Sequence, residues 1–393
     1  MSPAPAIERG PSTISLLLYF LRLGTFGFGG PIALAGRMER DLVDERRWVS
    51  RQDYLEGLAF SQLSPGPLAA QLAMYIGWAQ AGWLGAALVA AAFVLPSFLM
   101  AVVVAAAYVV FGQLAWLHEA FYGIGAAVIA IIVQSAYRLS RKTIGSDAFL
   151  WSLFGVVAVT TVWTGSELIW LFVLCGVLRV VFKCTSSIAA RPALLSISIG
   201  MPWLLSGLSG SAPVGVVTTI GLFFLKAGAF VFGSGLAIVP FLYGGVVKQY
   251  QWLTEQQFLD AIAVAMITPG PVVITAAFIG YLVAGLAGSV AATTAVFAPP
   301  FLIVIIAAPY YQRVARNEHV KAFVQGVTAA AVGAIAGAAI ILARRALIDM
   351  PTVLIATGML VALFKLKRLP EPLLIVLAGV VGIAVQHYRG LMR

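Results

Sequence analysis

Residues 20–67 read FLRLGTFGFGGPIALAGRMERDLVDERRWVSRQDYLEGLAFSQLSPGP, and residues 224–271 read FLKAGAFVFGSGLAIVPFLYGGVVKQYQWLTEQQFLDAIAVAMITPGP. The second stretch starts 204 residues after the first and aligns with it without a gap. After a one-residue deletion the match continues, so that glycines, a proline and a phenylalanine coincide again: Gly82, Gly85, Pro96 and Phe98 meet Gly285, Gly288, Pro299 and Phe301. The chain is therefore an internal duplication.

The composition excludes a soluble domain. Apolar residues make up 61% of the 393 and charged residues only 10%, whereas about a quarter of the residues in soluble domains are charged. Apolar stretches long enough for helical spans are 14–35, 82–111, 120–137, 148–163, 166–182, 213–234, 286–310, 321–343, 350–364 and 372–388. Backbone groups in lipid must pair within their own segment, and no short alternating runs typical of a barrel are present. We therefore predict an all-α polytopic membrane protein with about 13 crossings.

The net charge of +10 has a topological interpretation. Most Lys and Arg residues lie between the apolar segments, as in cytoplasmic loops, so the charge favours a membrane topology over a nucleic-acid partner. The first apolar run is long and belongs to the body of the protein, which is unlike a cleaved signal peptide. An inner membrane fits this pattern. Cys175 and Cys184 form no CxxC motif, and we expect them to be small apolar fillers.

Equivalent loops of the two copies differ in charge. The first connector carries five arginines between 37 and 51, but its counterpart at 241–255 carries only Lys248. The bias reverses later, because 112–119 lacks Lys and Arg while the matching stretch carries Arg313, Arg316 and Lys321. Acidic residues that offset the first loop count little in this rule. We predict an inverted-topology repeat, with a first repeat at 1–193, a linker helix at 194–212 and a second repeat at 213–393.

Each copy is interrupted twice at matching places. The first break is Gly27–Pro31, matched by Val231–Gly235, and the second is Ser64–Pro67, matched by Thr268–Pro271. Proline removes a helix donor and glycine lets the chain bend, so helices end and restart there. The restarted helices expose N–H groups, which favour an anion, and paired breaks indicate a transporter's midplane site. Tight helix packing around glycine is the structural alternative.

Several polar residues flank the second break. Ser64 or Thr268 can cap the next helix or donate a hydroxyl to a ligand, and we consider Gln71 and Thr275, just past the break, as secondary ligands. Segments 52–64 and 66–78 are each short for a crossing. A re-entrant hairpin with Pro65-Gly66-Pro67 at its tip and a single broken crossing both remain open.

Charged residues also repeat inside the apolar segments. Arg22 and Lys226 occupy equivalent positions, and a cation within the membrane costs at least about 2.5–3.5 kcal/mol. Two such cations predict a site for a dianion, unless they snorkel or pair with carboxylates. Glu56 and Asp260 are equivalent as well. They can pair with these cations, couple protons to transport, or simply lie at the interface.

Enzyme signatures are absent from the sequence. His118, His319 and His387 are far apart and show no metal-ligand spacing, and no dinucleotide, Walker or nucleophile-elbow motif occurs. We expect no metal, no cofactor and no catalytic residue. Without an ATP site, transport must use an ion gradient or the membrane potential.

The pattern FLxLGxxGFGGP…W…LSPGP…G…G, with its degenerate copy, resembles the chromate ion transporter (CHR) family, specifically its long members with two homologous domains. The resemblance covers nearly the whole chain. It implies export of chromate across a bacterial inner membrane, sulfate as a competing tetrahedral dianion, and halves of opposite topology. Position by position, it carries functional roles to these residues: Arg22, Gly27, Gly29, Gly30, Glu56, Pro65, Gly66, Pro67, Lys226, Gly233, Ser234, Asp260, Pro269, Gly270 and Pro271. The second copy departs from the pattern at Val231 and Ser234.

The leading hypothesis is a secondary transporter that exports chromate, driven by the membrane potential or a proton gradient. A carrier for sulfate or another oxyanion and a gated anion channel are the alternatives. A membrane-embedded enzyme or a structural subunit is disfavoured, because no catalytic constellation is visible. The oligomeric state stays open, a homodimer included.

Overall fold

The computed structural model describes residues 12–28, 31–111, 115–164, 169–185, 213–230, 235, 238–311, 317–365 and 371–391. The predicted linker 194–212 and the predicted site residues Gly29, Gly30, Gly233 and Ser234 lie outside these ranges.

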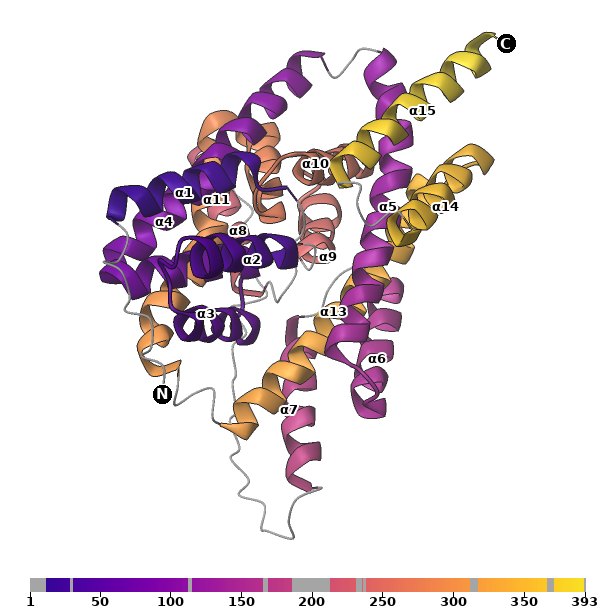
Figure 1. Cartoon of the computed structure of the whole chain (residues 1–393). Helices are drawn as coiled ribbons and strands as arrows, with labels where there is room; N and C mark the ends of the chain where they lie inside the picture. Colours follow the sequence, from indigo (N-terminus) through magenta and orange to yellow (C-terminus); the bar gives the residue numbers. More distant parts are fainter. Residues whose placement is uncertain are drawn as a thin grey trace.

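The elements of the described ranges are all helices, which confirms the predicted all-α class (Figure 1). The first half contains α1 (Thr13–Phe26), α2 (Pro31–Met38), the π-helix η1 (Glu39–Glu45), α3 (Arg51–Leu63), α4 (Leu68–Phe111), α5 (Ala115–Thr143), α6 (Ala148–Thr164) and α7 (Ile169–Thr185). The second half contains α8 (Pro213–Phe230), α9 (Ile238–Leu242), the π-helix η4 (Tyr243–Gln249), α10 (Glu255–Ile267), the 3-10 helix η5 (Val272–Ile274), α11 (Thr275–Ala307), the 3-10 helix η6 (Ala308–Tyr310), α13 (Glu318–Ala346), α14 (Met350–Lys365) and α15 (Glu371–Leu391).

The duplication extends to the backbone conformation. The π-helices η1 and η4 occupy matching positions, and so do α3 and α10. Two equivalent non-glycine residues are left-handed, Arg47 with φ 53° and Gln251 with φ 52°. Left-handed backbone is uncommon outside glycine, so its recurrence at one position of each copy shows that the two halves share a fold as well as a sequence pattern.

The first break forms the tip of a helical hairpin. Tyr19 of α1 donates to Asp41 of η1 at 3.3 Å, and Arg37 of α2 donates to the Phe26 carbonyl at 3.2 Å. Residues before the glycine-rich break therefore lie beside residues after it, in antiparallel order. The chain enters through α1, turns at the break and returns through α2 and η1.

The Pro-Gly-Pro turn of the first half is the tip of a second hairpin. The amide Nε2 of Gln80 donates to the Trp48 carbonyl at 3.2 Å, so the chain before α3 meets the end of the first segment of α4. Midway along, Gly57 of α3 abuts the ring of Tyr75. Of the two open alternatives, the structure shows the hairpin. The 13 residues of α3 span about 20 Å, roughly two thirds of a bilayer core.

A second sharp turn then divides α4. Ala81 and Gly82 leave the helical region, with φ −145° and 61°, and their counterparts Ala284 and Gly285 in α11 have φ −143° and 59°. Gly77 lies against the backbone of Gly85 across this turn. Each long helix thus consists of a short segment that closes the hairpin and a long segment that continues away from it.

The helices form two groups, and both halves contribute to each (Figure 1). In one group α1 packs on α4, α8 packs on α11, and α4 packs on α11. In the other, α5 of the first half packs on α14 and α15 of the second, and α13 packs on α6 and α7. The two sequence repeats are therefore interlocked in the fold.

Small residues make this interlocking possible. Gly123 of α5 lies against the backbone of Ala378 in α15, and Gly326 of α13 lies against that of Cys175 in α7. The contact between Gly326 and Cys175 is the counterpart, in the other half, of the contact between Gly123 and Ala378. Cys175 is buried at 3% exposure, as expected for a small filler. For these glycines, tight packing is the explanation.

Polar clusters hold the same helices together at their ends. Asp349, between α13 and α14, accepts from Tyr122 of α5 at 2.6 Å and from Arg389 of α15 at 2.6 Å. Asp147, between α5 and α6, accepts from Arg179 of α7 at 2.6 Å, and Arg179 also donates to Gln325 of α13. The Asp349 cluster joins α15 of the second half to α5 of the first half, and the Asp147 cluster joins α7 of the first half to α13 of the second half.

The two long helices α5 and α13 run in opposite directions in Figure 1, as an inverted repeat requires. Five helices of the described residues are long and apolar enough to cross a membrane, and four shorter apolar helices accompany them. The total of about 13 crossings stays a prediction, because the linker 194–212 lies outside the described residues. Stretch 14–35, predicted as one span, is broken at its glycine-rich segment.

Candidate anion site between the two halves

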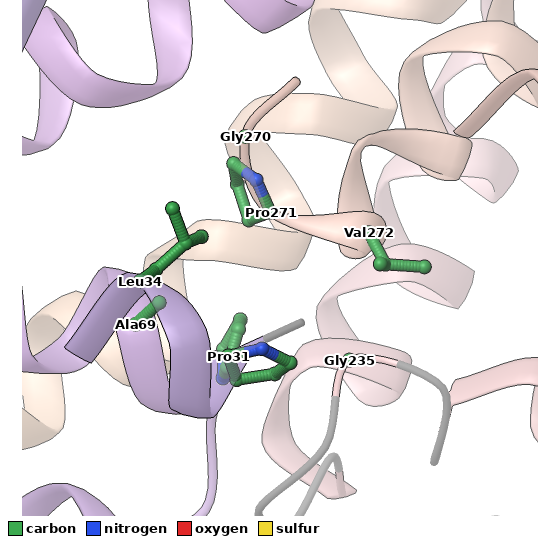
Figure 2. A pocket seen from close by; sticks show the side chains of 8 residues that line it. Pro31, Leu34, Ala69, Gly235, Gly270, Pro271 and Val272 are labelled. Atoms are coloured by element: carbon green, nitrogen blue, oxygen red, sulfur yellow. The ribbon is translucent and has the colours of Figure 1, made fainter. Parts of the chain in front are cut away.

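The breaks of both halves meet at one pocket. Its lining comes from the first half and the second half in equal number: Pro31, Leu34, Pro67 and Ala69, with Gly235, Gly270, Pro271 and Val272. Figure 2 shows Pro31, Leu34 and Ala69 on one side of the pocket and Gly270, Pro271 and Val272 on the other. Segments more than 200 residues apart in sequence are thereby brought together.

Three helices begin at this pocket. Pro31 is the first residue of α2, Pro67 directly precedes α4, and Pro271 directly precedes η5. Proline suits the start of a helix because its missing N–H would have no partner there. At the start of α4, the Gln71 N–H donates to the carbonyl of Pro67, the residue before the helix, at 2.9 Å. The N–H groups of residues 68–70 thus have no acceptor within α4.

The turns are held by contacts that cross between halves. The Gly270 N–H donates to the Gly27 carbonyl at 3.0 Å, which joins the Pro-Gly-Pro turn of the second half to the glycine-rich break of the first. Gly270 has φ 100° and touches Ser97 of α4. Gly66, with φ 143°, lies against Pro300 of α11. Because Ser97 and Pro300 are equivalent residues, each turn packs on the other half in the same way.

The hydroxyl groups beside the turns have local acceptors. Ser64 ends α3 and donates to the Phe60 carbonyl at 2.8 Å, and Thr268 ends α10 and donates to the Ala265 carbonyl at 3.2 Å. Thr275 donates to the Val272 carbonyl at 2.7 Å. The alternative that Ser64 or Thr268 caps the next helix was wrong, because each hydroxyl completes the helix that precedes it. A direct role of these residues in binding stays a prediction.

Gln71 is fully buried one turn into α4. Its Nε2 donates to the Pro65 carbonyl at 2.7 Å, which braces the first Pro-Gly-Pro turn from inside. Its Oε1 is buried and has no hydrogen-bond partner in the described part of the chain. Leaving a buried acceptor unsatisfied costs about 1–3 kcal/mol, so the residue is a poor choice for a purely structural position. This oxygen accepts hydrogen bonds and does not bind an oxyanion, so the role of Gln71 as an anion ligand stays a prediction.

The two intramembrane cations lie elsewhere. Arg22 and Lys226 are exposed, neither lines the pocket, and among the described residues neither forms an ion pair. The buried face of α1 consists of Leu16, Tyr19, Phe20, Leu23 and Gly24. Position 22 is on the opposite face. The pocket lining carries no charged side chain, so backbone N–H groups are its positive groups.

The two equivalent carboxylates differ in their surroundings. Asp260 is buried at 4% exposure and accepts from Tyr108 of α4 at 2.7 Å and from Gln256 at 3.0 Å. Glu56 is half-buried and accepts from Gln52 at 3.1 Å. The Gln–carboxylate pairs match between halves.

Tyrosines complete this arrangement across the halves. Tyr311, the counterpart of Tyr108, lies directly beyond the span that ends at Tyr310. Its ring contacts Phe60 of α3, with the ring centroids 5.5 Å apart. Sequence reasoning missed both tyrosines, although their equivalence after the one-residue deletion was a usable signal.

Comparison with known proteins agrees with this architecture. The family model described as Chromate transporter matches residues 14–180 and again residues 218–383. A protein named "Chromate transport protein" from Cupriavidus metallidurans is 52% identical over 94% of this chain and 92% of its own length. A "Probable chromate transport protein" from Synechococcus elongatus is 53% identical over 94% of both chains.

A more distant relative, the "Chromate transport protein" of Pseudomonas aeruginosa, is 31% identical over 93% of this chain and 91% of its own length. No solved structure matches the chain. The family model covers each half separately and most of the chain in total, and the resemblance seen in the sequence is therefore confirmed: this protein belongs to the chromate transporter family.

Proposed function

We propose that the pocket between the two halves widens to bind a dehydrated oxyanion and that the chain is a secondary transporter that exports chromate from the cytoplasm. The observation that carries the proposal is the convergence of three helix starts, those of α2, α4 and η5, on one pocket without a charged lining residue. The names of the relatives, which are chromate transport proteins, support chromate as the ion.

The energetics favour direct N–H contacts over long-range dipole effects. Each helix start stabilises an anion by about 0.3–1 kcal/mol, and by about 2 kcal/mol in favourable geometry. The cost of removing a dianion from water is far larger. N–H groups must therefore replace the water hydrogen bonds one by one, as those of residues 68–70 are free to do. Sulfate has the same shape and charge, so we expect it to compete.

The driving force is the second part of the proposal. We infer that the membrane potential or a proton gradient drives export, with Glu56 and Asp260 as the candidate proton carriers. A carrier whose physiological substrate is sulfate or another oxyanion, and a gated anion channel, are the alternatives. Equal access to both sides in a channel forbids uphill movement, whereas a carrier supports both uphill movement and exchange.

The test is chromate flux in proteoliposomes, with an imposed potential and, separately, an imposed pH gradient. Val272 is half-buried and lines the pocket at the start of η5. V272D places a carboxylate at a helix start, where it is tolerated electrostatically and competes with the substrate. We expect V272D to abolish flux and the neutral V272N to retain most of it. Equal flux in both variants would contradict an anion site here.

A further inference from the structure

The two hairpins contain matching helical stripes that differ in polarity and burial. In α3 the stripe consists of Gln52, Leu55, Glu56, Ala59 and Gln62, and in α10 it consists of Gln256, Leu259, Asp260, Ala263 and Met266. Leu55 is 51% exposed, whereas the equivalent Leu259 is 3% exposed. Gln62 is exposed, whereas Met266 is buried.

Packing explains why one stripe is covered. α10 contacts α5 and α15, and Tyr108 closes over Asp260. In Figure 1, α10 lies between the two groups of helices. The main packing partners of α3 are α4 and η1, both within its own half. No equivalent of α5 or α15 lies over it to the same extent, so its stripe remains open.

The chemistry of the open stripe indicates what faces it. Two glutamines and a glutamate along one exposed helical face are costly against acyl chains. The covered stripe of α10 has apolar Met266 where α3 has Gln62. The α3 stripe is open along its length, whereas in α10 every stripe residue beyond Gln256 is buried. This difference at matching positions of one fold indicates that water reaches α3.

The stripe connects the protein surface to the candidate anion site. It begins beside the arginine-rich connector, which carries Arg40 and Arg51 and which the charge rule assigns to the cytoplasm. It ends at Ser64 and the first Pro-Gly-Pro turn, where Pro65 is half-exposed while the equivalent Pro269 is buried. From there the pocket residue Pro67 is two residues further along the chain.

We infer that the polar stripe of α3 lines an aqueous route from the cytoplasmic face to the anion site, and that α10 seals the matching route in this conformation. The route rests on the proposed function for the identity of the ion that uses it. The site then has one open side and one closed side, as a carrier requires.

Cysteine labelling tests the route without any transport measurement. In full-length protein with Cys175 and Cys184 replaced by alanine, single variants Q62C and L55C are compared with the matched M266C and L259C. A membrane-impermeant maleimide is applied to sealed vesicles of both orientations. We expect Q62C and L55C to react from the cytoplasmic side only, at least about tenfold faster than their matched partners, which react only after local opening.

Two results would overturn the route. One is Q62C and L55C that react only with a lipid-soluble maleimide, because the stripe then faces acyl chains. The other is equal rates for the matched positions, because α10 is then as open as α3. Q62C and L55C are two independent variants, so if one of them misfolds, the other still tests the route. Flux without labelling contradicts the route alone, whereas labelling without flux contradicts the proposed function alone.

Discussion

Individual residues of the anion site are defined more by backbone geometry than by side-chain charge. Gly270 donates its N–H to Gly27 and has a backbone conformation, φ 100°, that side chains rarely adopt. The equivalent Gly66 of the other half also has a positive φ, 143°. At both positions a methyl group meets the opposite half of the molecule. Glycine is required there for conformation and for space at once.

We therefore expect G270A to abolish chromate flux. Alanine costs about 1–3 kcal/mol in such a conformation, and its methyl group displaces Ser97 or the turn itself. Flux in proteoliposomes measures the effect, with the amount of monodisperse protein in detergent as the check on folding. G155A is the control, because nothing lies near Gly155 in α6. Normal flux in G270A would show that the cross-half contact is dispensable.

Glu56 is the residue that links pH to transport in our proposal. It is half-buried, bonded to Gln52 and close to Tyr311. Glutamine mimics the protonated carboxyl, so we expect E56Q to transport chromate with a rate that no longer varies with pH. The measurement is the initial flux over a series of pH values. D53N, on the exposed start of the same helix, should keep the native pH dependence. A native profile in E56Q would leave Glu56 with a structural role.

Of the predicted site residues, Pro67, Gly270 and Pro271 line the pocket, whereas the two cations do not. Breaks at equal positions in two copies have few physical explanations, and the structure brings them together at one pocket. Arg22 was predicted to contribute to the anion site because it lies deep in an apolar run, but its depth does not determine which face of the helix it occupies. The buried residues of α1 at 16, 19, 20, 23 and 24 show a helical period that leaves position 22 outside.

At the scale of elements, the duplicated hairpin is the unit that builds the site. The short helix α3 ends at the Pro-Gly-Pro turn, and the first segment of α4 returns beside it. The sequence left open whether this unit was a hairpin or a broken crossing, because both have the same apolar length. The contact between Gln80 and Trp48 distinguishes them, and it depends on tertiary structure. Contacts between halves, such as that of Tyr108 with Asp260, were equally inaccessible to local reasoning.

The hydrogen-bonded clusters at Asp147 and Asp349 hold together the group of helices that contains α5 and α13. The cluster at Asp349 predicts that the stability of the protein depends on pH. Burial opposes ionisation of Asp349, but hydrogen bonds from Tyr122 and Arg389 outweigh it and hold the pKa of this carboxyl below its ordinary value. A depressed pKa stabilises the folded state at pH values above the ordinary pKa of aspartate, which is about 3.9. This contribution to stability is lost as the pH falls below that value.

D349N should therefore lower the thermal unfolding midpoint by a few degrees at neutral pH. The difference from the native protein should shrink as the pH falls below about 4, because the Asp349 carboxyl of the unfolded chain then binds a proton, which stabilises the unfolded state. Thermal unfolding in detergent at both pH values measures this. D44N removes only an exposed, distant ion pair with Arg51 at 3.9 Å and should change little. A constant difference at every pH would contradict the ionic role of Asp349.

At the scale of the whole molecule, two interlocked halves give one site with two unequal sides. The same fold is used twice, yet α3 keeps a polar stripe exposed while α10 is covered. An inverted repeat places these two hairpins toward opposite faces of the membrane. A structure in which one hairpin is open and the other sealed is what alternating access to a fixed site requires, and a symmetric structure would be open to both sides or to neither.

Opposite orientation of the halves can be measured directly at Arg47 and Gln251. These equivalent residues are both exposed and both left-handed, so a substitution at either meets the same local strain. In protein lacking Cys175 and Cys184, we expect R47C to react with an impermeant maleimide from the cytoplasmic side and Q251C from the opposite side. Reaction of both from one side would mean that the halves are parallel. The two hairpins would then open toward the same compartment, and a chain built that way could not move an anion from one face of the membrane to the other by exchanging which hairpin is sealed.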